Sequence, residues 1–145
     1  MSKLPSTKLT VADYPLAETR LDQIRGKRGL ALEQITLASV MAGNVTMADL
    51  QITPKALKDQ AEISADAGRG ALALNFARAA ELVDVPQAVI MSTYELLRPG
   101  RAKSRQELYE RAGLMRDTYG APAIADFIQE AADIYEARGL FSRRY

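Results

Sequence analysis

Residues 104–139 have the sequence SRQELYERAGLMRDTYGAPAIADFIQEAADIYEARG, and this stretch decides the fold. Ser104 and Glu107 have the spacing of a capping box. Pro122 favours the start of a second helix, which Gly139 ends. Apolar residues recur at helical spacing in both segments: Leu108, Ala112, Met115 and Tyr119, then Ile124, Phe127, Ile128, Ala131, Ile134 and Tyr135. The pattern predicts two amphipathic helices joined by a short turn.

The residues before this stretch carry similar helix boundaries. Thr53-Pro54 is a strong helix start, Thr46 followed by Asp49 is a weaker one, and Gly43 suits the position after a helix. Alanine is abundant while Val and Ile are sparse, which favours helix over strand. The predicted helices cover approximately residues 32–42, 54–67, 71–83, 86–98, 105–120 and 122–138. We therefore expect an all-α fold, a small bundle of about five to six helices.

The first 30 residues differ from the rest in composition. They contain two prolines, two glycines and scattered charges. Such a segment favours an extended N-terminal arm that lies on another surface. The expected organisation is an arm of residues 1–30 and a helical domain of residues 31–145.

The overall composition excludes several kinds of chemistry. The chain has no Cys and no His, so a thiolate nucleophile, a disulfide and the usual zinc site are excluded. Lys and Arg number 19 against 18 Asp and Glu, and no segment is basic enough for nucleic-acid binding. No apolar run is long enough to span a membrane, and the N-terminus lacks a signal-peptide pattern. The expected location is the cytoplasm.

Two groups of charged residues could carry chemistry. The segment Arg25-Gly26-Lys27-Arg28-Gly29 could cradle a phosphate, but it lacks the strand and helix of a phosphate loop. A solvated basic turn fits it better. Carboxylates and arginines alternate along residues 105–117, where the spacing favours ion pairs within one helix over an acid–base site. The chain alone is expected to be inactive.

Residues 71–77, ALALNFA, are apolar nearly all round, which is typical of a helix covered on several sides. A chain this short does not readily cover such a helix alone, which indicates a partner. Asn75, Arg78 and Glu81 form one polar stripe on it. The stripe is either a solvated ridge, with Arg78 and Glu81 paired, or a set of charge-assisted hydrogen bonds to a partner protein.

Many short motifs, taken in order, resemble the small subunit of the adenosylcobalamin-dependent diol and glycerol dehydratases. They begin with Asp13-Tyr14-Pro15-Leu16-Ala17, Gly26-Lys27, Ile35-Thr36-Leu37, Val40, Gly43, Val45, Asp49-Leu50-Gln51-Ile52-Thr53, Leu57, Gln60-Ala61 and Ile63. They continue with Asn75-Phe76, Arg78-Ala79-Ala80-Glu81-Leu82, Val85-Pro86, Ile90, Tyr94, Leu97-Arg98-Pro99, Glu107-Leu108, Phe127, Glu130-Ala131 and Tyr135. The resemblance covers nearly the whole chain, although no single motif is diagnostic.

The resemblance implies a lyase complex of large, medium and small subunits, each present twice. Such a complex converts 1,2-propanediol or glycerol to an aldehyde with loss of water, by a radical that starts from adenosylcobalamin. Substrate and cofactor are bound by the other subunits, and the small subunit packs on the large one. Some relatives carry a long extension before the Asp13 motif, associated with packing into microcompartments; this chain has only twelve residues there and does not indicate such packing.

The expected role is therefore a non-catalytic structural subunit that binds no cofactor, metal or nucleic acid. The alternative is a helical adaptor of an unrelated complex. The sequence does not distinguish propanediol from glycerol. The residues expected at the partner interface are Asp13, Tyr14, Pro15, Asn75, Arg78, Glu81 and Arg98.

Overall fold

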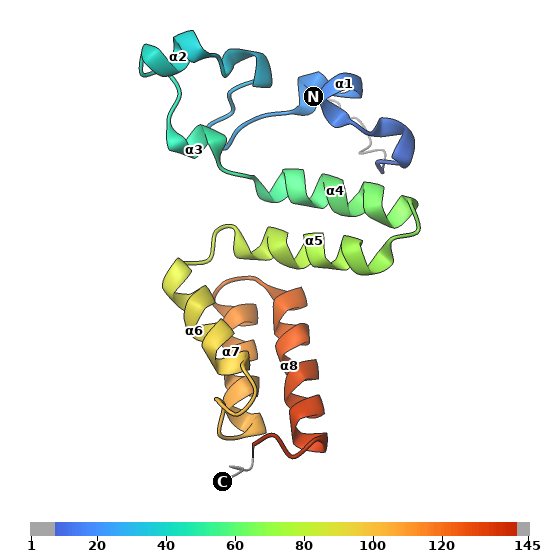
Figure 1. The fold of residues 1–145 in the computed structure, drawn as a ribbon, viewed down its shortest axis with the longest axis vertical. Coiled ribbons are helices and arrows are strands. Elements are labelled where there is room, and N and C mark those ends of the chain that lie inside the picture. Colours follow the sequence, from blue (N-terminus) through green and yellow to red (C-terminus); the bar gives the residue numbers. More distant parts are fainter. Residues whose placement is uncertain (1–7, 142–145) are drawn as a thin grey trace. The chain divides into compact units, whose positions relative to one another are not determined.

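The computed structural model describes residues 8–141, and every regular element within that range is a helix or a helical turn. Figure 1 shows the helices in chain order. The helices are α1 (Leu16–Thr19), α2 (Leu37–Met41), α3 (Met47–Leu50), α4 (Pro54–Asp66), α5 (Gly70–Leu82), α6 (Gln87–Leu97), α7 (Arg105–Asp117) and α8 (Pro122–Ala137). Short 3-10 turns cover Val11–Asp13, Leu21–Gln23 and Leu32–Gln34. The expected all-α class is confirmed.

The helix starts follow the local signals in the sequence. The Thr53 hydroxyl accepts a hydrogen bond from the backbone N–H of Ala56 at 3.1 Å, and Pro54 occupies the first helical position of α4. The Ser104 hydroxyl accepts from Glu107 N–H at 3.3 Å at the start of α7. The Glu107 carboxylate, however, accepts from Lys103 N–H rather than from Ser104, so only half of the expected capping box forms.

The predicted helix over residues 32–42 is divided in two. A 3-10 turn occupies Leu32–Gln34, and α2 begins only after Thr36, whose hydroxyl caps it by accepting from Ser39 N–H at 3.1 Å. A threonine that caps a new helix has an extended backbone, which ends the preceding turn. Gly43 ends α2 with a φ of +76°, as expected of a glycine after a helix.

The chain forms two compact units, residues 1–80 and 81–145, and the division falls within α5. Residues 8–30 belong to the first unit, where short helical turns alternate with extended residues. The separate division into an arm of residues 1–30 and a domain of residues 31–145 stays a prediction.

The second unit has a well-packed core between α7 and α8, which lie antiparallel and side by side (Figure 1). Leu108, Met115 and Ile128 are the largest fully buried side chains. The helices meet through small residues that are also fully buried, namely Ala112, Ala121, Ala125 and Ala132. Alanines at these positions let the two backbones approach closely, and partly buried apolar side chains of α6 and α8, including Leu97 and Tyr135, pack against this core.

The buried face of α8 differs from the predicted stripe. Ile124 and Ile128 are buried as expected, but Phe127 and Ile134 are each 41% exposed. Ala125 and Ala132 take the inner positions instead. The prediction was wrong here because the close packing against α7 admits the smaller side chains and turns the larger ones outward.

Candidate partner-binding surface

Large apolar side chains are exposed mainly on the first unit. Among the described residues, eleven lie there and five on the second unit. Six of the eleven lie on α2, on α3 or just after α3, and we call them the 37–52 surface. They are Leu37, Val40, Met41, Met47, Leu50 and Ile52. Leu37, Met41 and Met47 are 78, 80 and 75% exposed. So many apolar side chains in one short segment are typical of a protein–protein interface.

An ion pair between the exposed Arg28 and the buried Asp49 anchors this segment to the loop before it. Arg28 Nε donates to Asp49 Oδ1 at 2.8 Å, and its Nη2 contacts Asp49 Oδ2 and donates to the carbonyl of Asn44 at 3.0 Å. The backbone N–H of Thr46 donates to Asp49 Oδ2 at 2.8 Å. Asp49 is only 4% exposed. The basic turn of residues 25–29 is therefore not simply solvated: one of its arginines holds α3 in place.

The loop can approach α3 so closely because residue 26 is glycine. A Cβ atom at Gly26 would lie 3.0 Å from the backbone carbonyl oxygen of Asp49. Such a contact is tighter than most Cβ contacts, so with a larger residue the loop and α3 would have to move apart by a few tenths of an ångström.

The Asp49 pair predicts a pH-dependent stability. The Arg28 guanidinium, and then the Thr46 N–H, lower the pKa of the Asp49 carboxyl from 3.8 to about 2. Since the folded-state pKa is the lower one, this carboxylate stabilises the folded chain fully above its unfolded pKa and loses that effect as the pH falls towards 2. We expect Asp49→Asn to lower the urea midpoint of unfolding at pH 7, and the difference from the unaltered chain to shrink between pH 4 and pH 2.

The exposed Asp22, replaced by Asn, is the control for this measurement, and its difference from the unaltered chain should be small at both pH values. A difference for Asp49→Asn that stayed constant from pH 7 to pH 2 would contradict the prediction.

The N-terminal segment is fixed on α4 by hydrogen bonds to two carboxylates. The backbone N–H of Leu9 donates to Glu62 at 2.8 Å, and that of Val11 donates to Asp66 at 2.9 Å. Further along, the Asp13 carboxylate accepts from Thr10 N–H and from Arg20 Nε, both at 2.9 Å. These contacts, the Thr10 N–H first and Arg20 second, lower the pKa of Asp13. Asp13 therefore ties the turn that begins at Thr10 to Arg20, at the end of α1.

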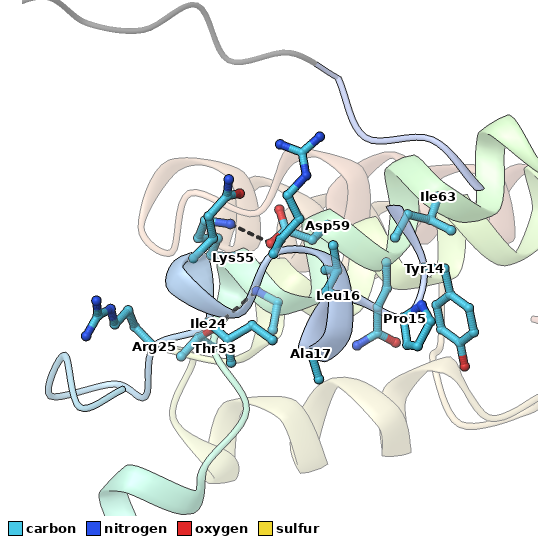
Figure 2. Close-up of a pocket in the computed structure, with 14 residues that line it drawn as sticks. Tyr14, Pro15, Leu16, Ala17, Ile24, Arg25, Thr53, Lys55, Asp59 and Ile63 are labelled. Atoms are coloured by element: carbon cyan, nitrogen blue, oxygen red, sulfur yellow. Dashed lines mark hydrogen bonds and ion pairs between the residues drawn. The ribbon is translucent and has the colours of Figure 1, made fainter. Parts of the chain in front are cut away.

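A hollow of about 420 Å³ lies between residues 14–25 and α4 (Figure 2). Its lining is mostly apolar, with Leu16 and Ile24 in the middle, and Tyr14 and Arg25 lie at opposite ends. Tyr14 is 70% exposed. The full lining is Tyr14, Pro15, Leu16, Ala17, Arg20, Gln23, Ile24, Arg25, Thr53, Lys55, Ala56, Asp59, Gln60 and Ile63. Two of the expected interface residues, Tyr14 and Pro15, thus line a hollow of the first unit, and Asp13 orders the turn beside them.

The other expected interface residues lie elsewhere. On α5, Arg78 Nη1 donates to Asn75 Oδ1 at 3.4 Å, so these two side chains are joined along one face of the helix. Leu72 and Leu74 of the same helix are 38 and 46% exposed, so the described chain leaves part of this apolar helix uncovered. Arg98 is exposed and pairs with Glu95 at 3.2 Å, an interaction typical of a solvated helix end.

Glu81 has an internal role that the sequence pattern did not indicate. Its two carboxylate oxygens accept the backbone N–H groups of Ala123 and Ile124, each at 2.9 Å. These are N–H groups of the first turn of α8, where Ala121 offers no side-chain cap. A carboxylate at this end also interacts favourably with the helix dipole. Glu81 thus caps a helix more than 40 residues away, a relation that no local motif signals.

Replacing Glu81 with Ala should destabilise the second unit by about 1–3 kcal/mol, because two charge-assisted hydrogen bonds to a helix N-terminus are lost. Urea denaturation followed by circular dichroism measures the effect. Glu130→Ala, an exposed carboxylate on α8, is the control and should change stability by less than about 0.5 kcal/mol. Equal effects of the two substitutions would contradict the capping role.

The charged residues of α7 pair mainly with other segments, not within the helix as predicted. Arg105 Nε donates to Asp133 of α8 at 2.7 Å, and this contact lowers the pKa of Asp133. Arg116 pairs with Asp126 at 2.6 Å, and Arg111 donates to Ser92 at 2.7 Å. The prediction was wrong because α8 and α6 bring partners within reach of these long side chains. The three arginines of α7 therefore join this helix to α6 and α8.

Within residues 8–141, no three His, Cys, Asp or Glu side chains are grouped so that they could hold a metal ion. Over the same range, no helix is both long enough and apolar enough to cross a membrane. The features that stand out on this chain are surfaces: the 37–52 surface and the hollow beside α4.

Comparison with known proteins agrees with the sequence pattern. The family described as "Dehydratase small subunit" matches residues 9–142. The propanediol dehydratase small subunit of Citrobacter freundii is 42% identical over 128 residues, which cover 88% of this chain and 74% of that protein. The propanediol dehydratase small subunit of Salmonella typhimurium is 41% identical over 133 residues, covering 92% of this chain and 76% of the relative.

Proposed function

The chain belongs to the dehydratase small subunit family, and on this premise we propose that it is the non-catalytic small subunit of a propanediol or glycerol dehydratase. Its work is to bind and stabilise the subunits that carry the reaction. The observation that supports this role most directly is the 37–52 surface, where six large apolar side chains face solvent in the isolated chain. Covering them with a partner removes apolar area from water, which is the main driving force of stable association.

The proposed partners are a large and a medium subunit, in a dimer of three-chain units that works in the bacterial cytoplasm. The proposed cofactor of the complex is adenosylcobalamin, which would supply the radical that abstracts a substrate hydrogen. The residues of this chain do not fit that cofactor. The chain has no His to offer the cobalt an imidazole ligand, and the hollow of about 420 Å³ has a mostly apolar lining, in which Lys55 pairs with Asp59 and Arg20 pairs with Asp13. We therefore assign cofactor binding to the other subunits.

The interface roles of Asp13, Tyr14, Pro15, Asn75, Arg78 and Arg98 are part of this proposal. The exposure of Tyr14 and the uncovered apolar residues beside Asn75 support two of these positions. For Glu81, the carboxylate is engaged with the start of α8, so any contribution to the interface is through the position of that helix.

Co-expression with the large and medium subunits of a dehydratase tests the function. The tagged small subunit should retain both partners in equal amounts, and native mass spectrometry should give two copies of each chain. Aldehyde formation from 1,2-propanediol should require the complex and adenosylcobalamin. The isolated chain should bind no cobalamin in equilibrium dialysis. Retention of unrelated proteins alone would favour the adaptor alternative, and stoichiometric cobalamin binding by the isolated chain would refute a purely structural role.

A further inference from the structure

The hollow beside α4 has the features of a docking site for a protein segment. Its lining combines half-buried apolar side chains in the middle, including Leu16 and Ile24, with the aromatic side chain of Tyr14 at one end and a cation at the other (Figure 2). An exposed tyrosine at the edge of an apolar hollow is a residue type that often contributes strongly to binding. The hollow therefore has two distinguishable ends, and it can fix the direction of a bound chain.

Four of the polar side chains that line the hollow are already engaged: Arg20, Thr53, Lys55 and Asp59. Lys55 Nζ pairs with Asp59 at 2.5 Å, and Arg20 pairs with Asp13 at 2.5 Å. The Thr53 hydroxyl caps α4. A small-molecule site usually presents several convergent polar groups, and these side chains are instead committed to the fold. An apolar side chain from a partner protein suits such a lining better than a polar ligand does.

The end of the hollow at Arg25 differs from the rest of the lining because its charged side chain is not engaged by the described part of the chain. Within residues 8–141, the guanidinium of Arg25 has neither a hydrogen bond nor an ion pair, and the residue is exposed. Figure 2 shows its side chain extending away from the other lining residues. Arg20 and Lys55 also line the hollow, but Asp13 and Asp59 neutralise them, so Arg25 is the lining cation without a counter-charge among the described residues. Its positive charge complements an acidic group.

We propose that the hollow binds an extended segment of a partner dehydratase subunit, with an apolar side chain between Leu16 and Ile24 and a carboxylate at Arg25. The inference rests on the proposed function and adds the chemistry of the segment that is recognised. Burial of the apolar side chain supplies affinity, and the pairing with Arg25 selects the orientation of the segment.

Charge reversal and filling of the hollow test the proposal in the assembled complex. Arg25→Glu places a like charge opposite the carboxylate, and Ala17→Phe fills the lining. We expect each change to weaken retention of the partner by about 10-fold or more, as for the loss of a good interface contact. The matched controls are Lys58→Glu and Ala65→Phe, both at exposed positions of α4 outside the hollow, and they should change retention by less than about 2-fold.

A photo-crosslinking phenylalanine analogue in place of Tyr14 identifies the occupant. The crosslinked partner peptide should contain an apolar residue close to an Asp or Glu, and changing that acid to Lys should restore binding to Arg25→Glu. If Arg25→Glu and Ala17→Phe retained the partner as well as their two controls do, the inference would be overturned and the proposed function would stand. A crosslinked peptide without a carboxylate would have the same meaning. A chain that retains no dehydratase subunit at all would refute both. Crosslinking only to a second copy of this chain would also overturn the inference.

Discussion

Replacing both Leu37 and Met41 with Glu will reduce the affinity of the small subunit for its partner subunits by about 30-fold to 1000-fold. Truncation or disruption of a central interface residue typically costs about 2 kcal/mol or more, which is about 30-fold in affinity, and the effects of two neighbours are not strictly additive. Both side chains are about four-fifths exposed in the isolated chain. Their replacement should therefore leave the free energy of unfolding within about 0.5 kcal/mol per site.

Biolayer interferometry with the immobilised small subunit and the purified partner subunits measures this affinity. Met91→Glu is the control, because Met91 is 51% exposed on α6 of the second unit and outside the 37–52 surface. An equal loss of affinity in this control would mean that any apolar-to-charged change weakens the complex. Unchanged affinity in the Leu37 and Met41 variant would remove the 37–52 surface from the interface.

Leu108→Ala will destabilise the second unit by about 2–5 kcal/mol, the usual cost of removing a fully buried leucine and leaving a cavity. Leu108 is 0% exposed and belongs to the buried core cluster of the second unit, so its truncation leaves a cavity inside that core.

Hydrogen exchange followed by mass spectrometry localises the effect, because peptides from α7 and α8 report on the second unit separately from α4. Leu114→Ala is the matched control: it lies on the same helix but is 39% exposed, and it should cost less than about 1 kcal/mol. Faster exchange in α4 to the same degree as in α7 would show that the two units unfold together, and similar effects of the two substitutions would contradict the assigned core.

Several helix boundaries could be predicted because their signals are local, although the predicted helix over residues 32–42 is divided in two. Thr53, Ser104 and Gly43 act on backbone groups within three or four residues of themselves, so their effects do not depend on what else the chain approaches. The same holds for the class of the fold, since helical spacing and alanine content are properties of short windows. The absence of His and Cys likewise excludes common catalytic chemistry whatever the fold is.

The roles of several charged residues could not be predicted, because their partners are distant in sequence. Arg28 seemed part of a solvated turn, yet Asp49, 21 residues later, binds it. Glu81 seemed part of a surface ridge, yet it caps α8. Arg105 seemed to belong to an intrahelical pair, yet it binds Asp133 across the helical hairpin. A long charged side chain pairs with whichever group the fold brings within reach, and its sequence neighbours are only some of the candidates.

The lack of His and Cys and the family resemblance were thus properties of the sequence itself, carried by composition and by ordered short motifs along residues 13–135. Only the tertiary structure decided which apolar residues face solvent. It buried alanines between α7 and α8, turned Phe127 and Ile134 outward, and left Leu37 and Met41 exposed on the first unit. The physical reason is that periodicity gives each helix an apolar face, whereas the packing of helices against one another determines how much of that face is covered and how much remains for a partner.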